Sequence, residues 1–220
     1  MKGVFMQVFE YGNRDAETVL IQLADEHDLS LMSSEADAIR REAGENFRLI
    51  ALKVNDWNDD LSPWKSPAVF GHQDFGGRAE ETLQEVLKFC SCLEGVRYIG
   101  GYSLAGLFAL WAAYRTDLFN GVAAASPSIW FPGFTDFMRK NAIKCPAVYL
   151  SLGDGESRTR NPVMASVADR IGEARTILCD GGTECTLEWN QGGHFRDSDK
   201  RTAKGFSWLM SRAGGSPVHD

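Results

Sequence analysis

The sequence predicts an α/β protein with a mostly parallel, doubly wound sheet and helices on both faces. Short apolar runs rich in β-branched residues alternate with segments of helical periodicity along most of the chain, a pattern typical of parallel sheets. Several runs are apolar at every position, as expected where helices cover both faces of a sheet. The length of 220 residues and the hydrophobic content of 44% suit one domain with a sizeable core. We therefore expect a single domain over residues 1–220, with 214–220 as a flexible tail.

The strand candidates are short apolar runs, and they lie at 3–9, 18–24, 47–54, 96–100, 121–126, 147–152, 174–179 and 186–189. The first two are joined by the short polar segment 10–17, which is long enough for a hairpin but not for a helical crossover. We therefore expect these two strands to pair antiparallel at one edge of the sheet.

The helix candidates have apolar residues at helical spacing, and they lie at 33–44, 78–93, 104–116, 134–141, 160–172 and 197–212. Most of them stand between two strand candidates, where a helix can return the chain to the start of the next parallel strand. The stretch between Ser126 and Cys145 is too short for a large additional domain over the sheet. We expect only a minimal cap.

The charge of the chain argues against two classes of partner. The formal net charge is −7, and the pI is about 5.2. An acidic surface repels nucleic-acid phosphates and anionic lipids, so we expect neither nucleic acid nor membrane as a partner. No apolar run is long enough to span a bilayer, and the first residues lack the apolar stretch of a signal peptide.

The cysteines indicate a reducing compartment. They are odd in number and contain no CxxC pair; they are Cys90, Cys92, Cys145, Cys179 and Cys185. Reduced thiols in the cytoplasm explain this pattern better than a disulfide framework. No two cysteines stand at zinc-finger spacing with a histidine, so we expect no metal.

The most informative segment joins the strand candidate 96–100 to the helix candidate 104–116 through a serine, Ser103. A serine hydroxyl points out of the top of a sheet only where the chain turns sharply, and such a turn needs small residues on both sides. Gly101 and Ala105 stand two residues before and two residues after the serine. Because free N–H groups at a helix start stabilise a developing oxyanion, this segment predicts a nucleophile.

A serine hydroxyl needs a general base beside it. His194 follows the strand candidate 186–189 in the loop NQGGHF and precedes the helix candidate 197–212. This position matches the Ser–acid–His chain order of hydrolases with a nucleophile at a strand–helix turn. Gly192 and Gly193 would let the loop fold back toward the serine, so His194 is the predicted base.

The acid that orients the histidine is expected after the strand candidate 147–152. Two carboxyl groups compete there, Asp154 and Glu156. Hydrolases often place this acid three residues after a glycine that ends the strand, which favours Glu156 after Gly153. Asp154 remains the alternative acid.

Four segments together resemble an esterase branch of the α/β-hydrolase superfamily: GGYSLAGLFALW, SPSIWFPGF, LSLGDGESRTRNPVM and GGHFRDSDKRTAKGF. That branch includes esterase D-like enzymes, feruloyl esterases and siderophore esterases. The resemblance spans roughly 45–212, with the motifs in the family's order. It implies an α/β-hydrolase fold and a serine esterase with Ser103 as nucleophile, His194 as base and no cofactor. The glycine that the family usually has two residues after the serine is Ala105 here.

Two backbone N–H groups are expected to form the oxyanion hole. One belongs to Leu104, directly after the nucleophile, and the other to the loop after the strand candidate 47–54. In that loop, Asp56 and Trp57 are the two candidates.

Aromatic residues crowd the loops at the predicted carboxyl edge of the sheet, where open α/β sheets bind ligands. We expect Trp64, Trp130 and Phe131 to line an apolar substrate pocket that suits an acyl or aryl group. Core packing is the alternative explanation for these rings.

The sequence therefore predicts a cytoplasmic serine hydrolase that cleaves a small-molecule carboxylic ester through an acyl-enzyme. Two alternatives stay open. One is an acyltransferase or peptidase with the same three residues, and the other is an inactive hydrolase-like binding module.

Overall fold

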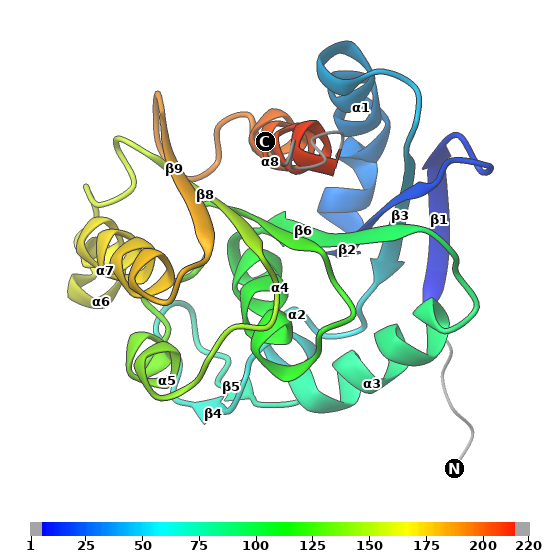
Figure 1. The fold of residues 1–220 in the computed structure, drawn as a ribbon. Helices are drawn as coiled ribbons and strands as arrows, with labels where there is room; N and C mark the ends of the chain where they lie inside the picture. The colour runs from blue at the N-terminus through cyan, green and yellow to red at the C-terminus, as the bar shows by residue number, and fades with distance from the viewer. Residues whose placement is uncertain (1–5, 214–220) are drawn as a thin grey trace.

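The computed structural model describes residues 6–213, in which a seven-stranded sheet is surrounded by helices (Figure 1). The strands are β1 (Gln7–Gly12), β2 (Thr18–Ala24), β3 (Arg48–Lys53), β4 (Lys65–Ser66), β5 (Phe75–Gly76), β6 (Val96–Tyr102), β7 (Gly121–Ala125), β8 (Ala147–Gly153) and β9 (Glu184–Asn190). The helices are α1 (Glu26–Ala43), α2 (Trp57–Asp60), α3 (Ala79–Cys90), α4 (Ser103–Arg115), α5 (Phe134–Lys140), α6 (Pro162–Ala165), α7 (Val167–Asp180) and α8 (Ser198–Ala213). The predicted tail 214–220, and the start of the strand predicted at 3–9, lie outside the described residues.

The strand order of the main sheet is β1-β3-β2-β6-β7-β8-β9. Every pair is parallel except β1 with β3. The predicted hairpin of the first two strands is therefore wrong, because β1 pairs with β3 and β2 lies between β3 and β6. Burial explains the difference. All residues of β2 are buried, so this strand needs neighbours on both sides, whereas the half-exposed β1 suits an edge.

The strand predicted at 174–179 is also wrong, because these residues belong to helix α7. The buried side chains of α7 are Val167, Ile171, Ala174 and Leu178. Their spacing of four, three and four residues places them on one face of a helix. The short run around Ile177 is apolar and, taken alone, resembles a buried strand. The helical spacing is visible only when the earlier turns of α7 are included.

Two hydrophobic clusters fill the space between the sheet and the helices on its two faces. Figure 1 shows α1 and α8 on one face and α3 and α4 on the other. The larger cluster lies beneath α3, α4, α5 and α7, and the smaller one lies beneath α1 and α8. Successive β2 residues alternate between them, with Ile21 in the larger cluster and Leu20 in the smaller, because neighbouring side chains of a strand point to opposite faces. The predicted doubly wound arrangement with helices on both faces is therefore confirmed.

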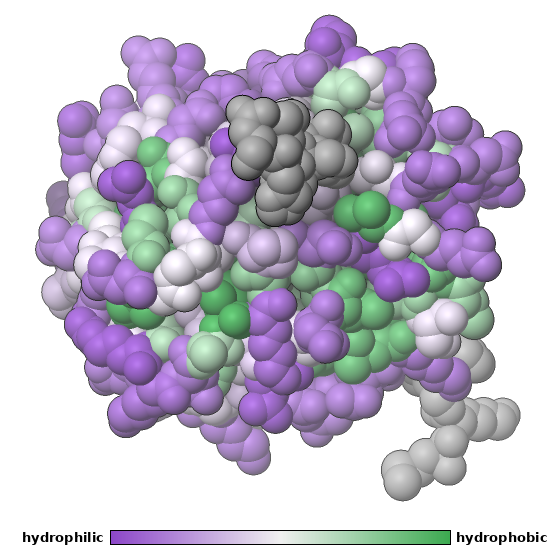
Figure 2. Space-filling view, viewed as in Figure 1, coloured by the Kyte–Doolittle hydropathy of each residue, from purple (hydrophilic) through white to green (hydrophobic). Residues whose placement is uncertain are grey.

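Helix α4 is buried on almost every side, from Leu104 to Tyr114, and it lies directly after the central strand β6 (Figure 1). Hydrophilic residues cover most of the face shown in Figure 2, with smaller hydrophobic areas between them. Within residues 6–213, none of the helices combines the length and the apolar character that crossing a bilayer requires.

Candidate active site

The turn between β6 and α4 holds Ser103 in a strained conformation. Its φ is 55°, in the left-handed region that residues with a side chain rarely adopt. The turn is tight, because a Cβ added at Gly101 would lie 2.7 Å from the Cβ of Ala105, and one added at Gly106 would lie 2.8 Å from the Gly101 carbonyl oxygen. Ala105 itself is fully buried. The methyl group at this position therefore fits the turn as long as residue 101 has no side chain.

Three side chains from separate parts of the chain form a continuous hydrogen-bonded row. The Oγ of Ser103 lies 3.0 Å from the Nε2 of His194. The Nδ1 of His194 lies 2.7 Å from the Oε2 of Glu156. A carboxylate can only accept hydrogen bonds, so Nδ1 carries the proton and Nε2 is left as the acceptor of the serine hydroxyl. This is the tautomer that a general base requires.

The two candidate acids differ in their surroundings. Glu156 contacts His194 and its side chain is only 3% exposed. Asp154 is exposed, and its Oδ1 instead accepts a hydrogen bond from the backbone N–H of Gly192 at 2.9 Å. Asp154 therefore helps to fix the loop before His194, while Glu156 is the carboxylate that contacts the imidazole.

The Glu156 carboxyl group stays ionised although it is buried. Burial raises its pKa. Contact with His194 and hydrogen bonds from Ser126 and the backbone of Gly153 lower the pKa by more than burial raises it, so that the pKa of Glu156 lies below its usual value. The N–H of Gly153 and the hydroxyl of Ser126 both donate to Oε1 at 2.7 Å. The carboxylate is thus available to stabilise a positive charge on the imidazole.

The loop that carries His194 is held against the carboxyl ends of the strands. Gly192 has a φ of 105°, and its carbonyl oxygen would lie only 2.3 Å from a Cβ at Gly153. The hydroxyl of Tyr102 donates to the carbonyl oxygen of His194 at 2.6 Å. Burial raises the pKa of Tyr102 to about 12, so this hydroxyl keeps its proton.

The two predicted oxyanion donors in the β3–α2 loop differ in availability. The N–H of Asp56 already donates to the carboxylate of Asp60 at 2.9 Å, so it is not free to bind an oxyanion. Trp57 is the first residue of α2, where N–H groups have no partner within the helix, and it lines the cavity beside Ser103. Leu104 lies in the corresponding first turn of α4, which has no side-chain cap. The geometry therefore favours Leu104 and Trp57.

A cavity of about 350 Å³ opens beside Ser103 and His194. Its other lining residues are Trp57, Phe70, Ser126, Pro127, Trp130, Glu156, Met164, Val167 and Phe195. Of the three predicted pocket aromatics, only Trp130 belongs to this lining. Phe131 is buried in the larger core cluster, and Trp64 packs edge-on against it at 5.6 Å between ring centroids. The indole N–H of Trp64 donates to the Pro132 carbonyl oxygen, and Phe131 lines a separate cavity of about 410 Å³ together with Trp130.

Several residues of this site lack an evident signal in the sequence. Ser128 lies 3.2 Å from Ser103, Oγ to Oγ. Met164 and Phe195 lie in two of the segments that carry the family resemblance, but neither side chain is of a type that indicates a role at the site. Ser126 has a φ of 42°, and Ser103 and Ser126 are two of the three non-glycine residues with positive φ within residues 6–213. Backbone strain of this kind concentrates at functional sites, but it can be recognised only in the folded chain.

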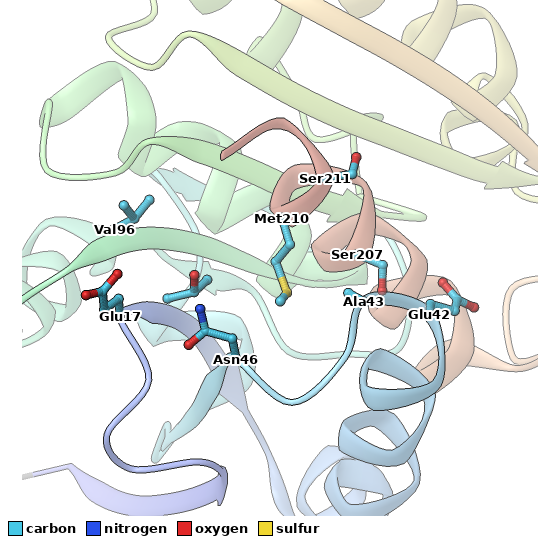
Figure 3. A pocket seen from close by; sticks show the side chains of 9 residues that line it. Glu17, Glu42, Ala43, Asn46, Val96, Ser207, Met210 and Ser211 are labelled. Carbon is cyan, nitrogen blue, oxygen red and sulfur yellow. The ribbon is translucent and has the colours of Figure 1, made fainter. Parts of the chain in front are cut away.

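A second cavity, of about 520 Å³, lies at the opposite ends of the strands, where β2 and β6 begin. Figure 3 shows it between α1, α8 and the start of β6, where Val96 lies. Its lining includes Glu17, Glu42 and Ser207, and none of the described residues that line it is a histidine. Within the described part of the chain, no group of three or more His, Cys, Asp or Glu side chains is arranged to hold a metal ion.

A parallel sheet with one antiparallel edge strand, and a serine at the turn after its central strand, define the α/β-hydrolase fold. No protein-family model and no curated protein sequence matches the chain. Among solved structures, an IroE-like serine hydrolase from Shewanella oneidensis is 15% identical with a TM-score of 0.73, over 96% of this chain and 82% of that one. The enterobactin esterase FES from Shigella flexneri is 12% identical with a TM-score of 0.67, over 94% of this chain and 55% of that one.

Enzymes with a different acyl acceptor share the fold. The capsule O-acetyltransferase of Neisseria meningitidis serogroup A is 9% identical with a TM-score of 0.57, over 94% of this chain and 92% of that one. At these identities the comparisons establish the fold, and the predicted α/β-hydrolase fold is confirmed.

Proposed function

We propose that this chain is a serine esterase that hydrolyses a small-molecule carboxylic ester. The observation that carries the proposal is the row of contacts from Ser103 to His194 and from His194 to Glu156, at 3.0 and 2.7 Å. A row with this geometry activates a hydroxyl for attack on a carbonyl carbon. The solved structures with the same fold include several esterases and serine hydrolases, which supports this chemistry.

The reaction has two halves. His194 Nε2 takes the proton of Ser103 as its Oγ bonds to the ester carbonyl carbon, and the N–H groups of Leu104 and Trp57 bind the oxyanion. The protonated His194 then gives its proton to the leaving alcohol, which leaves the acyl group on Ser103. Water, deprotonated by the same imidazole, attacks the acyl carbon, the bond from this carbon to Ser103 Oγ breaks, and His194 returns the proton to Oγ as the carboxylic acid is released. Glu156 stabilises the imidazolium in both halves.

The cavity favours an uncharged acyl group. Most of its walls are apolar or aromatic, including Trp130, Met164 and Val167. Among the described residues, no lysine or arginine belongs to its lining, and the carboxylate of Glu156 already has donors. An anionic acyl chain would lose hydration there without gaining a counter-ion.

Labelling with a fluorophosphonate probe, followed by a screen of p-nitrophenyl esters, tests the proposal. We expect the probe to label the wild type at Ser103, and Ser103→Ala to lose both labelling and ester hydrolysis. Ser207→Ala is the matched control, because Ser207 is also buried but lies on α8 beside the other cavity. Wild-type hydrolysis by Ser103→Ala would disprove the assignment of the nucleophile.

An acyltransferase is the second candidate, and the similarity to a capsule O-acetyltransferase favours it. Hydrolysis and transfer share the acyl-enzyme and differ in whether water or an alcohol attacks it. Product analysis with competing alcohols separates them. A rate of ester consumption that rises with alcohol concentration, together with a new ester as the main product, would indicate a transferase.

A further inference from the structure

Helix α8 carries a cation into the interior of the molecule, directly behind the candidate site. Arg201 is only 2% exposed, although an arginine is rarely buried unless its charge is paired. Its guanidinium contacts four segments of the site that are distant in the sequence. None of the catalytic steps proposed above uses this side chain.

One nitrogen of the guanidinium serves the acid and the nucleophile turn. Nη1 lies 3.0 Å from Glu156 Oε1, 3.0 Å from the hydroxyl oxygen of Tyr102 and 3.2 Å from Ser126 Oγ. The ion pair with Glu156 is buried on both sides, at 2% and 3% exposure. A buried pair with additional hydrogen-bond partners fixes its members firmly, because neither charge can exchange its partner for water.

The other nitrogen serves the histidine loop. Nη2 donates to the carbonyl oxygens of Gln191 at 3.3 Å and Gly193 at 3.1 Å. These residues precede His194, whose own carbonyl oxygen accepts from Tyr102. The guanidinium therefore connects the acid to the backbone that determines where the imidazole lies.

We propose that Arg201 is a positioning residue, which fixes the Glu156 carboxylate and the His194 loop relative to each other. This inference rests on the proposed esterase function. A planar guanidinium with five N–H donors can reach acceptors on both sides at once, whereas a lysine ammonium on its flexible stem cannot hold the same set. Arginine is thus specifically suited to this position.

The positive charge should also affect the pH dependence of the reaction. The groups that face Glu156 are the imidazole of His194, the guanidinium of Arg201 and the hydroxyl groups of Ser126 and Tyr102. Removing the Arg201 charge takes away the cation that lies 3.0 Å from Glu156 Oε1, so protonation of this carboxylate becomes easier. The acidic limb of the kcat/KM profile should therefore move to higher pH.

The test compares Arg201→Met and Arg201→Lys with Lys204→Met, which removes a cation of the same helix that contacts Glu188 and Asn190 outside the site. We expect Arg201→Met to lower kcat by about 100-fold through misplaced groups, with little change in KM and with the acidic limb displaced. Arg201→Lys should restore the pH profile but only part of kcat. Lys204→Met should behave like the wild type.

A double-mutant cycle with Glu156→Gln separates positioning from folding. If Arg201 acts through Glu156, Arg201→Met costs much less activity in the Glu156→Gln background than in the wild type. Equal losses in both backgrounds, with an unmoved acidic limb in soluble, folded protein, would overturn the proposal. If the wild type itself fails to react with fluorophosphonate, the esterase function fails instead. An active wild type with an equally active Arg201→Met variant refutes only the role of Arg201.

Discussion

Two carboxyl groups separated by one residue have opposite surroundings. Asp154 points to solvent and accepts a single backbone hydrogen bond, whereas Glu156 is buried and receives donors from four residues. A histidine in contact with an ionised, immobile carboxylate keeps one tautomer and one orientation. The difference between these two residues should therefore be visible in catalysis.

We expect Glu156→Gln to lower kcat by about three to four orders of magnitude, because an amide can favour the wrong imidazole tautomer. Asp154→Asn is the matched change, and it should leave kcat near the wild-type value because its amide oxygen can still accept from Gly192. Steady-state kinetics with one p-nitrophenyl ester measures both. A larger loss in Asp154→Asn than in Glu156→Gln would exchange the two assignments.

Some residues of the site could be predicted from the sequence, and others could not. Ser103 and His194 could be located because strand–turn–helix order and chain order are local properties. The contacts of Glu156 with Ser126 and Arg201 depend on how distant segments pack, which no local pattern records. One signal was present, however. Arg201 shares a face of its helix with Gly205 and Leu209, and a charge on a buried face is unusual enough to suggest a partner.

At the level of elements, the β6–α4 connection needs close contact between a strand end and a helix start. The 2.7 Å approach of a Cβ at residue 101 to Ala105 leaves no space for a side chain. This requirement made the turn recognisable in the sequence. The loop between β3 and α3 had no such requirement, and α2, β4 and β5 in that loop were not predicted.

Gly101→Ala should therefore destabilise the protein by about 1–3 kcal/mol through overpacking, and it should reduce activity by displacing Ser103. Gly172 provides the opposite case, since a Cβ there meets no atom within 4 Å and the residue lies inside α7. Gly172→Ala should stabilise the protein by about 0.5–1 kcal/mol. Urea unfolding measures both free energies. A stabilised Gly101→Ala variant would show that the turn is looser than its geometry indicates.

For the whole molecule, the pattern of fully apolar strands and intervening helices was sufficient to predict the layers, but not the edge of the sheet or helix α7. The edge depends on which strand is buried on both sides, a property of the assembled sheet.

All five cysteines are free, and the cytoplasmic location and the single domain over 1–220 stay predictions.

The stability of the whole molecule should depend on pH through Glu35 of α1. Burial raises the pKa of Glu35 well above its usual value, and nearby Asp28 and Asp199 raise it further, although a hydrogen bond from Gln22 opposes the shift. The folded state thus binds this proton more tightly than the unfolded state. The free energy of unfolding consequently falls as pH rises from the unfolded-state pKa through the folded-state pKa.

Glu35→Gln should remove this dependence, because an amide does not ionise. We expect the variant to exceed the wild type in stability at about pH 8 and to match it more closely near pH 4. Glu94→Gln, at an exposed position, is the control variant. Denaturant unfolding across this range tests the prediction, which would fail if Glu35→Gln were less stable at the higher pH.

The position of α8 and of the His194 loop has a consequence for how the protein is made. Both follow every strand of the described sheet in the chain, yet they supply the imidazole and the guanidinium that contact Ser103 and Glu156 or their supports. A nascent chain emerges from the ribosome with β6 and α4 first, and its serine then has no base beside it. If the chain has the proposed esterase activity, hydrolysis should therefore begin only once the loop and α8 have docked on the sheet.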